Sequence, residues 1–413
     1  MVNTIPGPIA PPLQTSVASR PFGRADPVRH RMPITFSGSG SEYFRIWIVN
    51  LLLTLVTLGL YFPWAKVRRL RYFYGNTSVG DYAFDFHGEP KRMLRGFLLV
   101  GAMALLYGLA SKVSPISGLI ALVIVAALWP ALFRASQQFR MANTSWRGLR
   151  FRFNGDMAGA YRAMLPLFIP GLMMLAATLF TGRPEDAAPG SDAAATGAVI
   201  LLVVAGAGML LVPLFLWMLK KYQHGHYALG QMQTELRTSA GSFYLIALKT
   251  IGVSLLAALA GAAAALVFGG GGALALLSGG GRSKGAAAAA ALVALVIALI
   301  VVYVAVILVV QPYVVSRMQN LVWGRTGSSQ VRFESDLRFW PLLWLTLKNL
   351  LLTIVTLGLY WPFAKVAMAR MRLQAVTVVT RLAPDDLVGT LRERADDAAG
   401  DAAGDLFGID IGL

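Results

Sequence analysis

The chain has 413 residues, long enough for two or three soluble domains, but its composition argues against a soluble protein. Charged residues make up only 14%, compared with about 25% in a typical soluble domain. Hydrophobic residues make up 56%, and the formal net charge is +17 at pH 7. The sequence contains no Cys, which excludes disulfides, thiolate metal sites, iron–sulfur clusters and Cys nucleophiles. It also shows no cofactor-binding motif, and we expect no cofactor.

The two ends of the chain differ in composition from its middle. Residues 1–33 hold seven Pro and no long apolar run, so we expect a Pro-rich disordered leader that does not resemble a signal peptide. Residues 381–413 are rich in Asp, and we expect an acidic solvated tail with one short helix near Leu387 to Ala395. Residues 34–380 form the predicted integral membrane domain.

The hydrophobic mass lies in eight segments. A bilayer core of about 30 Å needs roughly 20 apolar residues in a helix, because every backbone polar group has to be paired within the segment. Six segments meet this requirement and are predicted as transmembrane helices: 94–111, 115–134, 162–181, 197–219, 246–268 and 286–315. Two further hydrophobic segments lie at the ends of the membrane domain, over 44–65 and 340–364.

The basic residues fix the orientation of the six central spans. Four longer connections hold 20 Lys and Arg, over 66–95, 134–162, 220–242 and 316–339, whereas the alternating connections hold 4. Basic loops face the cytoplasm, so we expect a multi-pass protein of the bacterial inner membrane with these connections inside. Anionic lipid headgroups are the expected partner of such loops. We expect no nucleic-acid binding, because the spans interrupt the basic residues before they form a continuous stripe.

The clearest signal in the sequence is an internal repeat. Residues Asn50 to Val67 (NLLLTLVTLGLYFPWAKV) and Asn349 to Val366 (NLLLTIVTLGLYWPFAKV) are identical at 15 of 18 positions. A second pattern starts at Pro63 and recurs 67 residues later at Pro130, with weaker copies after Pro213 and Pro312. It runs from Pro through a basic helix and an Asn-Thr-Ser turn to a Phe-x-Phe-x-Gly strand.

The alternation in these Phe-x-Phe stretches is typical of strands with one covered face. Isolated strands leave their backbone groups unpaired, so we expect the short strands of separate connections to form a small cytoplasmic sheet. The alternative is that they are irregular loops on the lipid headgroups.

The two terminal hydrophobic segments have two interpretations. Full spans would make eight transmembrane helices, with both chain ends outside and the two copies of the repeat on opposite sides. Alternatively, each segment dips into the bilayer and returns. Gly59 and Gly358 suit such a turn, and Pro63 and Pro362 can open the helix that follows. The dips would then keep every basic end in the cytoplasm.

The motifs around these segments resemble a known family. The stretch ITFSGSGSEYFRIWIVNLLLTLVTLGLYFPWAKVRRLRYFYGNTSV, Ile34 to Val79, is similar to the YjgN family of bacterial inner-membrane proteins, as is RMANTSWRGLRFRFNGDM, Arg140 to Met157. The resemblance covers roughly residues 34–380, and TLGLYFPWAK is its most specific motif. It implies a polytopic inner-membrane protein of unknown function and supplies no catalytic or binding residues. The Ala/Gly-rich stretch from Leu255 to Ala291 departs from the family pattern.

Three polar residues lie inside apolar segments, where such residues mark either helix contacts or functional sites. Asn50 and Asn349 occupy equivalent positions of the repeat, and we interpret them as interhelical hydrogen-bond partners or, alternatively, as substrate contacts. Lys348 has Val49 as its counterpart, which argues against a symmetric ion site.

The first basic helix is expected to contact lipid headgroups through four cations: Lys66, Arg68, Arg69 and Arg71. His224 and His226 form a His-x-His pair, but the nearby sequence offers no further ligand, so we expect no metal site. Intramembrane carboxylates and the common catalytic motifs are missing from the six spans, and we expect no enzymatic activity.

These observations predict an all-α polytopic membrane protein with six full transmembrane helices, two terminal segments that are re-entrant or spanning, internal repeats and short cytoplasmic strands. Our preferred functional hypothesis is a transporter or channel-like protein, because broken segments in corresponding halves point to a binding site. The alternative is a non-transporting membrane scaffold or lipid-interacting protein with a basic cytoplasmic face. The sequence names no substrate, protein partner or oligomeric state.

Overall fold

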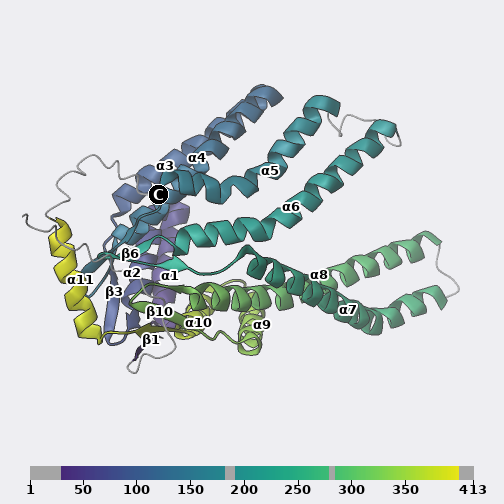
Figure 1. Cartoon of the computed structure of the whole chain (residues 1–413). Helices are drawn as coiled ribbons and strands as arrows, with labels where there is room; N and C mark the ends of the chain where they lie inside the picture. Colours follow the sequence, from purple (N-terminus) through teal and green to yellow (C-terminus); the bar gives the residue numbers. More distant parts are fainter. Residues whose placement is uncertain (1–28, 182–190, 279–283, 400–413) are drawn as a thin grey trace, which may run out of the picture.

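The computed structural model describes residues 29–181, 191–278 and 284–399. In Figure 1 the long helices extend to one side of a sheet, and the last helix lies at the other side. The helices are α1 (Gly40–Val56), α2 (Phe62–Gly75), α3 (Pro90–Val113), α4 (Pro115–Ala142), α5 (Met157–Thr181), α6 (Asp192–His224), α7 (Ala240–Ser278), α8 (Lys284–Gly324), α9 (Phe339–Val355), α10 (Trp361–Gln374) and α11 (Pro384–Ala399).

Short strands connect these helices and pair into one sheet. They are β1 (His30–Phe36), β2 (Thr77–Val79), β3 (Tyr82–Phe86), β4 (Thr144–Trp146), β5 (Leu149–Phe153), β6 (Tyr227–Leu229), β7 (Met232–Gln233), β8 (Glu235–Leu236), β9 (Thr326–Gly327), β10 (Val331–Ser335) and β11 (Val376–Thr380). The prediction of an all-α protein with a small sheet therefore understates the strands. Each strand has two to seven residues, so no single strand gives a strong sequence signal.

The sheet closes into a ring. Its strand order is β7-β6-β5-β4-β3-β2-β1-β11-β10-β9-β8, with antiparallel pairing throughout. The strands at the two ends of this order, β7 and β8, are one stretch of chain interrupted only by Thr234, whose N–H donates to the carbonyl of Tyr227 in β6. The first and last strands of the chain, β1 and β11, pair with each other. Without a free edge, the sheet is a small barrel.

Five strand–helix–helix–strand units make up this barrel. Two antiparallel strands flank each helix pair: β1 and β2 flank α1–α2, β3 and β4 flank α3–α4, β5 and β6 flank α5–α6, β8 and β9 flank α7–α8, and β10 and β11 flank α9–α10. Contacts between α1 and α10 join the last unit to the first. The five helix pairs are therefore arranged around the ring.

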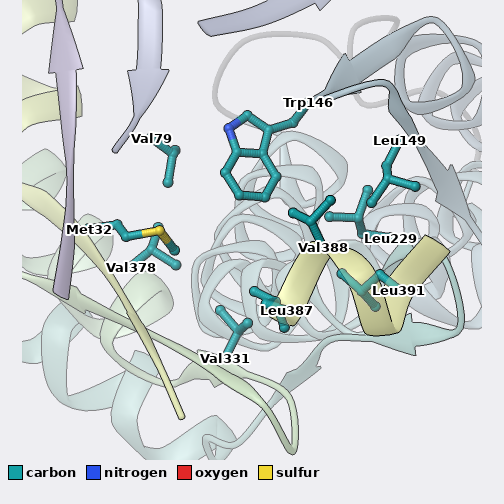
Figure 2. Close-up of a cluster of buried hydrophobic side chains, with 10 residues drawn as sticks. All are labelled: Met32, Val79, Trp146, Leu149, Leu229, Val331, Val378, Leu387, Val388 and Leu391. Carbon is teal, nitrogen blue, oxygen red and sulfur yellow. The ribbon is translucent and has the colours of Figure 1, made fainter. Parts of the chain in front are cut away.

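The barrel interior is apolar and is filled at one end by α11. An eight-stranded barrel is just wide enough for its own side chains, so this larger ring has room for more. Leu387, Val388 and Leu391 of α11 occupy that room, and Figure 2 shows them beside strand residues such as Trp146 and Leu229. The acidic segment from residue 381 is thus not solvated over its described first part, because three apolar residues one helical turn apart give α11 a buried face.

The two terminal hydrophobic segments are helical hairpins. Instead of one helix over 44–65, the chain ends α1 at Val56, reverses, and starts α2 at Phe62. Leu58 and Gly59 form the reversal with φ of 49° and 92°. The second copy is built in the same way from α9 and α10, with φ of 50° and 93° in its turn. At 1.5 Å per residue α1 is about 26 Å long and α3 about 36 Å, so these hairpins are shorter than the others.

The prediction of six apolar helices able to cross a membrane is confirmed. Among the described residues they are Pro90–Val113, Ile116–Ala142, Met157–Ala177, Asp192–His224, Ala240–Ala263 and Val296–Gly324. Between 6% and 22% of the most apolar stretch of each helix is buried inside the chain. These helices therefore present most of their apolar surface to their surroundings, as expected for contact with lipid. Of the predicted leader, residues 1–28 lie outside the described part, and β1 begins at His30.

Polar clasps join each unit to the next. In α4, Arg134 Nε donates to the carbonyl oxygen of Gly155 at 2.7 Å, at the junction between β5 and α5. Equivalent bonds to the junctions of the other units are Arg71 to Gly88 (3.2 Å), Trp217 to Thr238 (3.0 Å), Asn320 to Leu337 (3.0 Å) and Arg370 to Gly38 (2.8 Å). Each donor lies four or eight residues after the Pro of its helix, on one helical face.

Candidate functional site

Cationic side chains from four of the five helix pairs gather near the sheet. Arg140 of α4 lies close enough to Lys66 of α2 and Lys220 of α6 for its charge to act on both. Arg69 of α2 acts in the same way on Lys66 and on Lys365 of α10. Together these side chains form the central cation cluster, which consists of Lys66, Arg69, Arg140, Lys220, Lys365 and Arg372.

Burial and mutual repulsion disfavour the charged forms in this cluster. Burial lowers the pKa of Lys66, and the nearby charges of Arg69 and Arg140 lower it further. Burial followed by the charge of Arg69 lowers the pKa of Lys365, and burial lowers that of Arg372. Desolvation and like charges both act against a cation, so the folded chain holds these groups together at a cost.

The partners of these cations inside the chain are neutral. Arg140 Nη2 donates to Gln137 Oε1 at 2.8 Å. Arg372 Nε donates to Gln319 Oε1 at 2.9 Å. Within the described residues, no member of the cluster forms an ion pair with a carboxylate, and the buried Nε of Arg140 has no hydrogen-bond partner. An amide oxygen accepts a proton without cancelling the charge, so the cluster keeps its positive potential.

A pocket of about 480 Å³ opens beside the cluster, between α2, α9 and α10. We name it the basic pocket, and its polar lining consists of Arg69, Thr346, Asn349, Lys365 and Arg372. Apolar side chains of the three helices complete its wall. Its volume falls within the roughly 300–1,000 Å³ of sites that hold small molecules. The pocket thus combines three cations with two neutral polar groups.

The structure places the predicted polar residues of the two repeats differently. Asn50 and Asn349 are both buried, at 7% and 6% exposure, and the side-chain oxygen of each lacks a hydrogen-bond partner among the described residues. Asn349 Nδ2 lies 3.5 Å from the carbonyl oxygen of Ala364, which links α9 to α10. Of the two, Asn349 also lines the basic pocket. Lys348 is exposed on α9.

The four predicted lipid-facing cations divide between two faces of α2. Lys66 and Arg69 are half-buried and belong to the central cation cluster. Arg68 and Arg71 are exposed, and Arg71 supplies the clasp of its unit. Residues three apart on a helix share a face, which explains why the four cations separate in this way.

The four predicted turn residues lie at the two reversals. Gly59 and Gly358 have positive φ, and no atom outside their immediate neighbours comes within 4 Å of a Cβ built on either. Pro63 and Pro362 lie in the first turn of α2 and α10 and are buried. A Pro costs no hydrogen bond there, because the first N–H groups of a helix have no partner within it.

Sequence reasoning missed Arg140, Lys220 and Arg372 as members of a site. Each follows the Pro of its repeat unit by seven to ten residues, and this spacing is the signal that would have found them. Residues seven and ten positions after a common point lie on one face of a helix. Each unit contributes this face to the same region only because the ring closes.

The His-x-His pair is divided by its surroundings. His224 is buried, with Nδ1 3.1 Å from Thr326 Oγ1, and its ring lies edge-on to Trp323. Nδ1 of His226 lies 2.7 Å from the carbonyl oxygen of Tyr222. Among the described residues, no group of three or more His, Cys, Asp or Glu could hold a metal ion.

Comparison with known proteins places this architecture in a family. The family model described as "Bacterial protein of unknown function (DUF898)" matches residues 31–406. The chain is 32% identical over 148 residues to "Inner membrane protein YjgN" of Salmonella typhimurium strain LT2, covering 36% of this chain and 37% of the relative. It is 28% identical over 176 residues to the protein of the same name from Escherichia coli strain K12, covering 41% and 43%. No solved structure matches.

The resemblance to YjgN proteins is thus confirmed, although the chain spans less than half the length of the curated relatives it matches. The names of these relatives give a location and state no activity. Together with the six apolar helices, the comparisons show that the chain belongs to the DUF898 family of bacterial proteins and is a multi-pass protein of the inner membrane.

Proposed function

We propose that this protein is a transporter or channel-like protein that takes up its solute at the basic pocket. The observation that carries the proposal is the pocket itself, a space of about 480 Å³ lined by three cations, Thr346 and Asn349 amid largely apolar helices. Ionisable groups are costly near the hydrocarbon of a membrane, and those that persist there commonly mark the paths of ions and substrates.

The position of the pocket in the repeats supports this proposal. It is lined by α2, α9 and α10, which belong to the two short hairpins with Gly turns. Interrupted hydrophobic segments at corresponding places of two repeats are the best sequence indicator of a transporter binding site. The two hairpins lie side by side because the ring brings α1 against α10.

Flux through reconstituted liposomes tests the proposal. Liposomes that contain the purified protein and a panel of labelled small solutes should release at least one solute faster than protein-free liposomes. Ala364→Trp fills the basic pocket and should lower that release at least about tenfold. Ala104→Trp, on an exposed face of α3, is the matched control and should leave it unchanged. Equal release with and without protein for every solute would contradict the proposal.

A second candidate is a non-transporting protein that organises lipid. It is favoured by the exposed apolar surface of the six long helices and by the exposed cations Arg68 and Arg71. Cations at the cytoplasmic leaflet attract anionic headgroups. Energy transfer from the protein to fluorescent phosphatidylglycerol in nanodiscs should then fall in a double Arg68→Gln, Arg71→Gln variant, and unchanged transfer would count against this role.

A further inference from the structure

We propose that the central cation cluster and the basic pocket form a binding site for a multiply charged oxyanion, with a phosphate group as the ligand chemistry. The inference deepens the proposed function, because the site is the same pocket, but binding can be measured without any flux. The shared phosphate chemistry has two sources, a soluble phosphate compound or the headgroup of an anionic lipid.

The charge balance of the surrounding helices is the first argument. Six cations come together from α2, α4, α6 and α10. The sequences of α2, α4, α8 and α10 contain no Asp or Glu, and the one acidic residue of α6, Asp192, lies 28 positions before Lys220. The counter-charge of the cluster therefore has to come from outside these helices. A ligand with two or more negative charges supplies it most effectively, because each charge interacts with several cations.

The type of each side chain is the second argument. Arg69 and Arg372 present guanidinium groups to the pocket, and the planar guanidinium fork matches the oxygens of phosphate with two parallel hydrogen bonds. Lys365 adds a compact charge, and Thr346 adds a hydroxyl. The amides of Gln137 and Gln319 accept from Arg140 and Arg372, which orients the guanidinium groups without neutralising them.

The closed end of the barrel limits the directions of approach. Apolar side chains of the strands and of α11 fill the barrel interior at that end. The basic pocket instead opens between the helices α2, α9 and α10, which continue toward the membrane-spanning region. A ligand therefore enters beside the helices and not along the barrel axis through α11.

Binding of inorganic phosphate tests the site directly. We expect sodium phosphate to raise the melting temperature of the purified full-length protein in neutral detergent, and sodium chloride of equal ionic strength to have a much smaller effect. Arg69→Gln and Arg372→Gln should each weaken the phosphate affinity about ten- to a hundredfold, as expected for charge-assisted hydrogen bonds. Arg372→Lys should recover part of the loss. Arg332→Gln, an exposed cation of β10, should leave the affinity unchanged.

The source of the phosphate group needs a second arm. Short-chain phosphatidylglycerol should compete with phosphate if the site takes a lipid headgroup, whereas phosphatidylcholine of equal chain length should not. The absence of such competition, with phosphate binding intact, assigns a soluble ligand. If neither phosphate nor phosphatidylglycerol stabilises the protein more than chloride does, the proposal is overturned, even where the liposomes still release a solute. Binding without release would instead reject the proposed transport and leave the site standing.

Discussion

Gly59 lies in a backbone conformation that an L-residue adopts only with strain. Its φ is 92°, and a Cβ at this position would meet no atom within 4 Å. Any cost of a side chain therefore comes from the backbone alone. We expect Gly59→Ala to destabilise the protein by about 1–2 kcal/mol, measured as a fall in melting temperature in detergent.

Gly101 of α3 provides the control for this experiment. A Cβ there also meets no atom within 4 Å, but the backbone is helical. Gly101→Ala should stabilise the protein by roughly 0.5–1 kcal/mol, because Ala loses less conformational freedom than Gly in a helix. A Gly59→Ala variant as stable as Gly101→Ala would contradict the turn.

Lys66 should give the protein a pH dependence of known sign. Its pKa in the folded state lies below the ordinary value of 10.5, so the folded protein binds fewer protons than the unfolded chain between the two values. The free energy of unfolding then rises with pH across that window. The window is best examined below about pH 10, because Tyr begins to lose its proton there.

Lys66→Met removes this contribution. In a phosphate-free buffer the variant should melt at a higher temperature than the wild type at neutral pH, and the difference should shrink as the pH approaches 10. A constant difference across the range would show that Lys66 does not carry the repulsion described here.

At the scale of single residues, sequence and structure agree where the local backbone decides. The two Gly turns follow from the identity of the repeats and the tolerance of Gly for positive φ. The cation cluster could not be predicted in the same way. Arg140 and Lys220 are ordinary interfacial cations in the sequence, and only the closure of the ring brings them to Lys66.

The clasps between units are the main polar contacts between neighbouring elements. Arg134 is half-buried, and its bond to Gly155 joins α4 to the start of α5. Arg134→Met leaves that carbonyl without its charged donor, and we expect a loss of about 1.5–3 kcal/mol. Arg150→Met, on an exposed position of β5, should change the stability by less than about 0.5 kcal/mol. Thermal unfolding followed by the fluorescence of the nine Trp residues measures both.

The helix α11 should contribute to stability as a core element. Leu387 is 3% exposed and packs inside the barrel. Leu387→Ala should cost about 2–5 kcal/mol, as for other buried leucines. Asp386→Asn, one position earlier and exposed, should cost less than about 1 kcal/mol. Equal melting temperatures for the two variants would show that α11 is not packed as described.

At the scale of elements, length decided what the sequence could predict. The long apolar helices were predicted because a run of 20 apolar residues has one common explanation in proteins. The pairing of the strands was not predicted, because strands such as β8 and β9 have two residues each and their partners are almost 100 positions away. The apolar face of α11 was outweighed by its many acidic residues.

For the whole molecule, the ring places all strands and both described chain ends on one side of the long helices. The distribution of basic residues assigns this side to the cytoplasm. Since the chain has no Cys, single introduced thiols report the topology without background. In intact cells a membrane-impermeant maleimide should label Lys112→Cys, at the end of α3, and should label Ser329→Cys, in the turn before β10, only after lysis.

The same assay distinguishes the two interpretations of the terminal hydrophobic segments. Leu58 lies at the tip of the α1–α2 hairpin and is 94% exposed. If the hairpin dips into the bilayer, Leu58→Cys lies in hydrocarbon, where a thiol does not ionise, and should react in neither condition. Labelling of Leu58→Cys in intact cells would place the tip outside and reject the dip.

The pairing of β1 with β11 has a consequence for biogenesis. These strands lie about 340 positions apart in the chain and complete the circle. During synthesis the ribosome delivers β11 after all five helix pairs, so β1 stays unpaired on that edge until translation is nearly finished. A protein that closes on its earliest strand in this way is vulnerable to premature contacts with other nascent chains. A chaperone, or rapid docking of the neighbouring hairpin, would have to shield that edge.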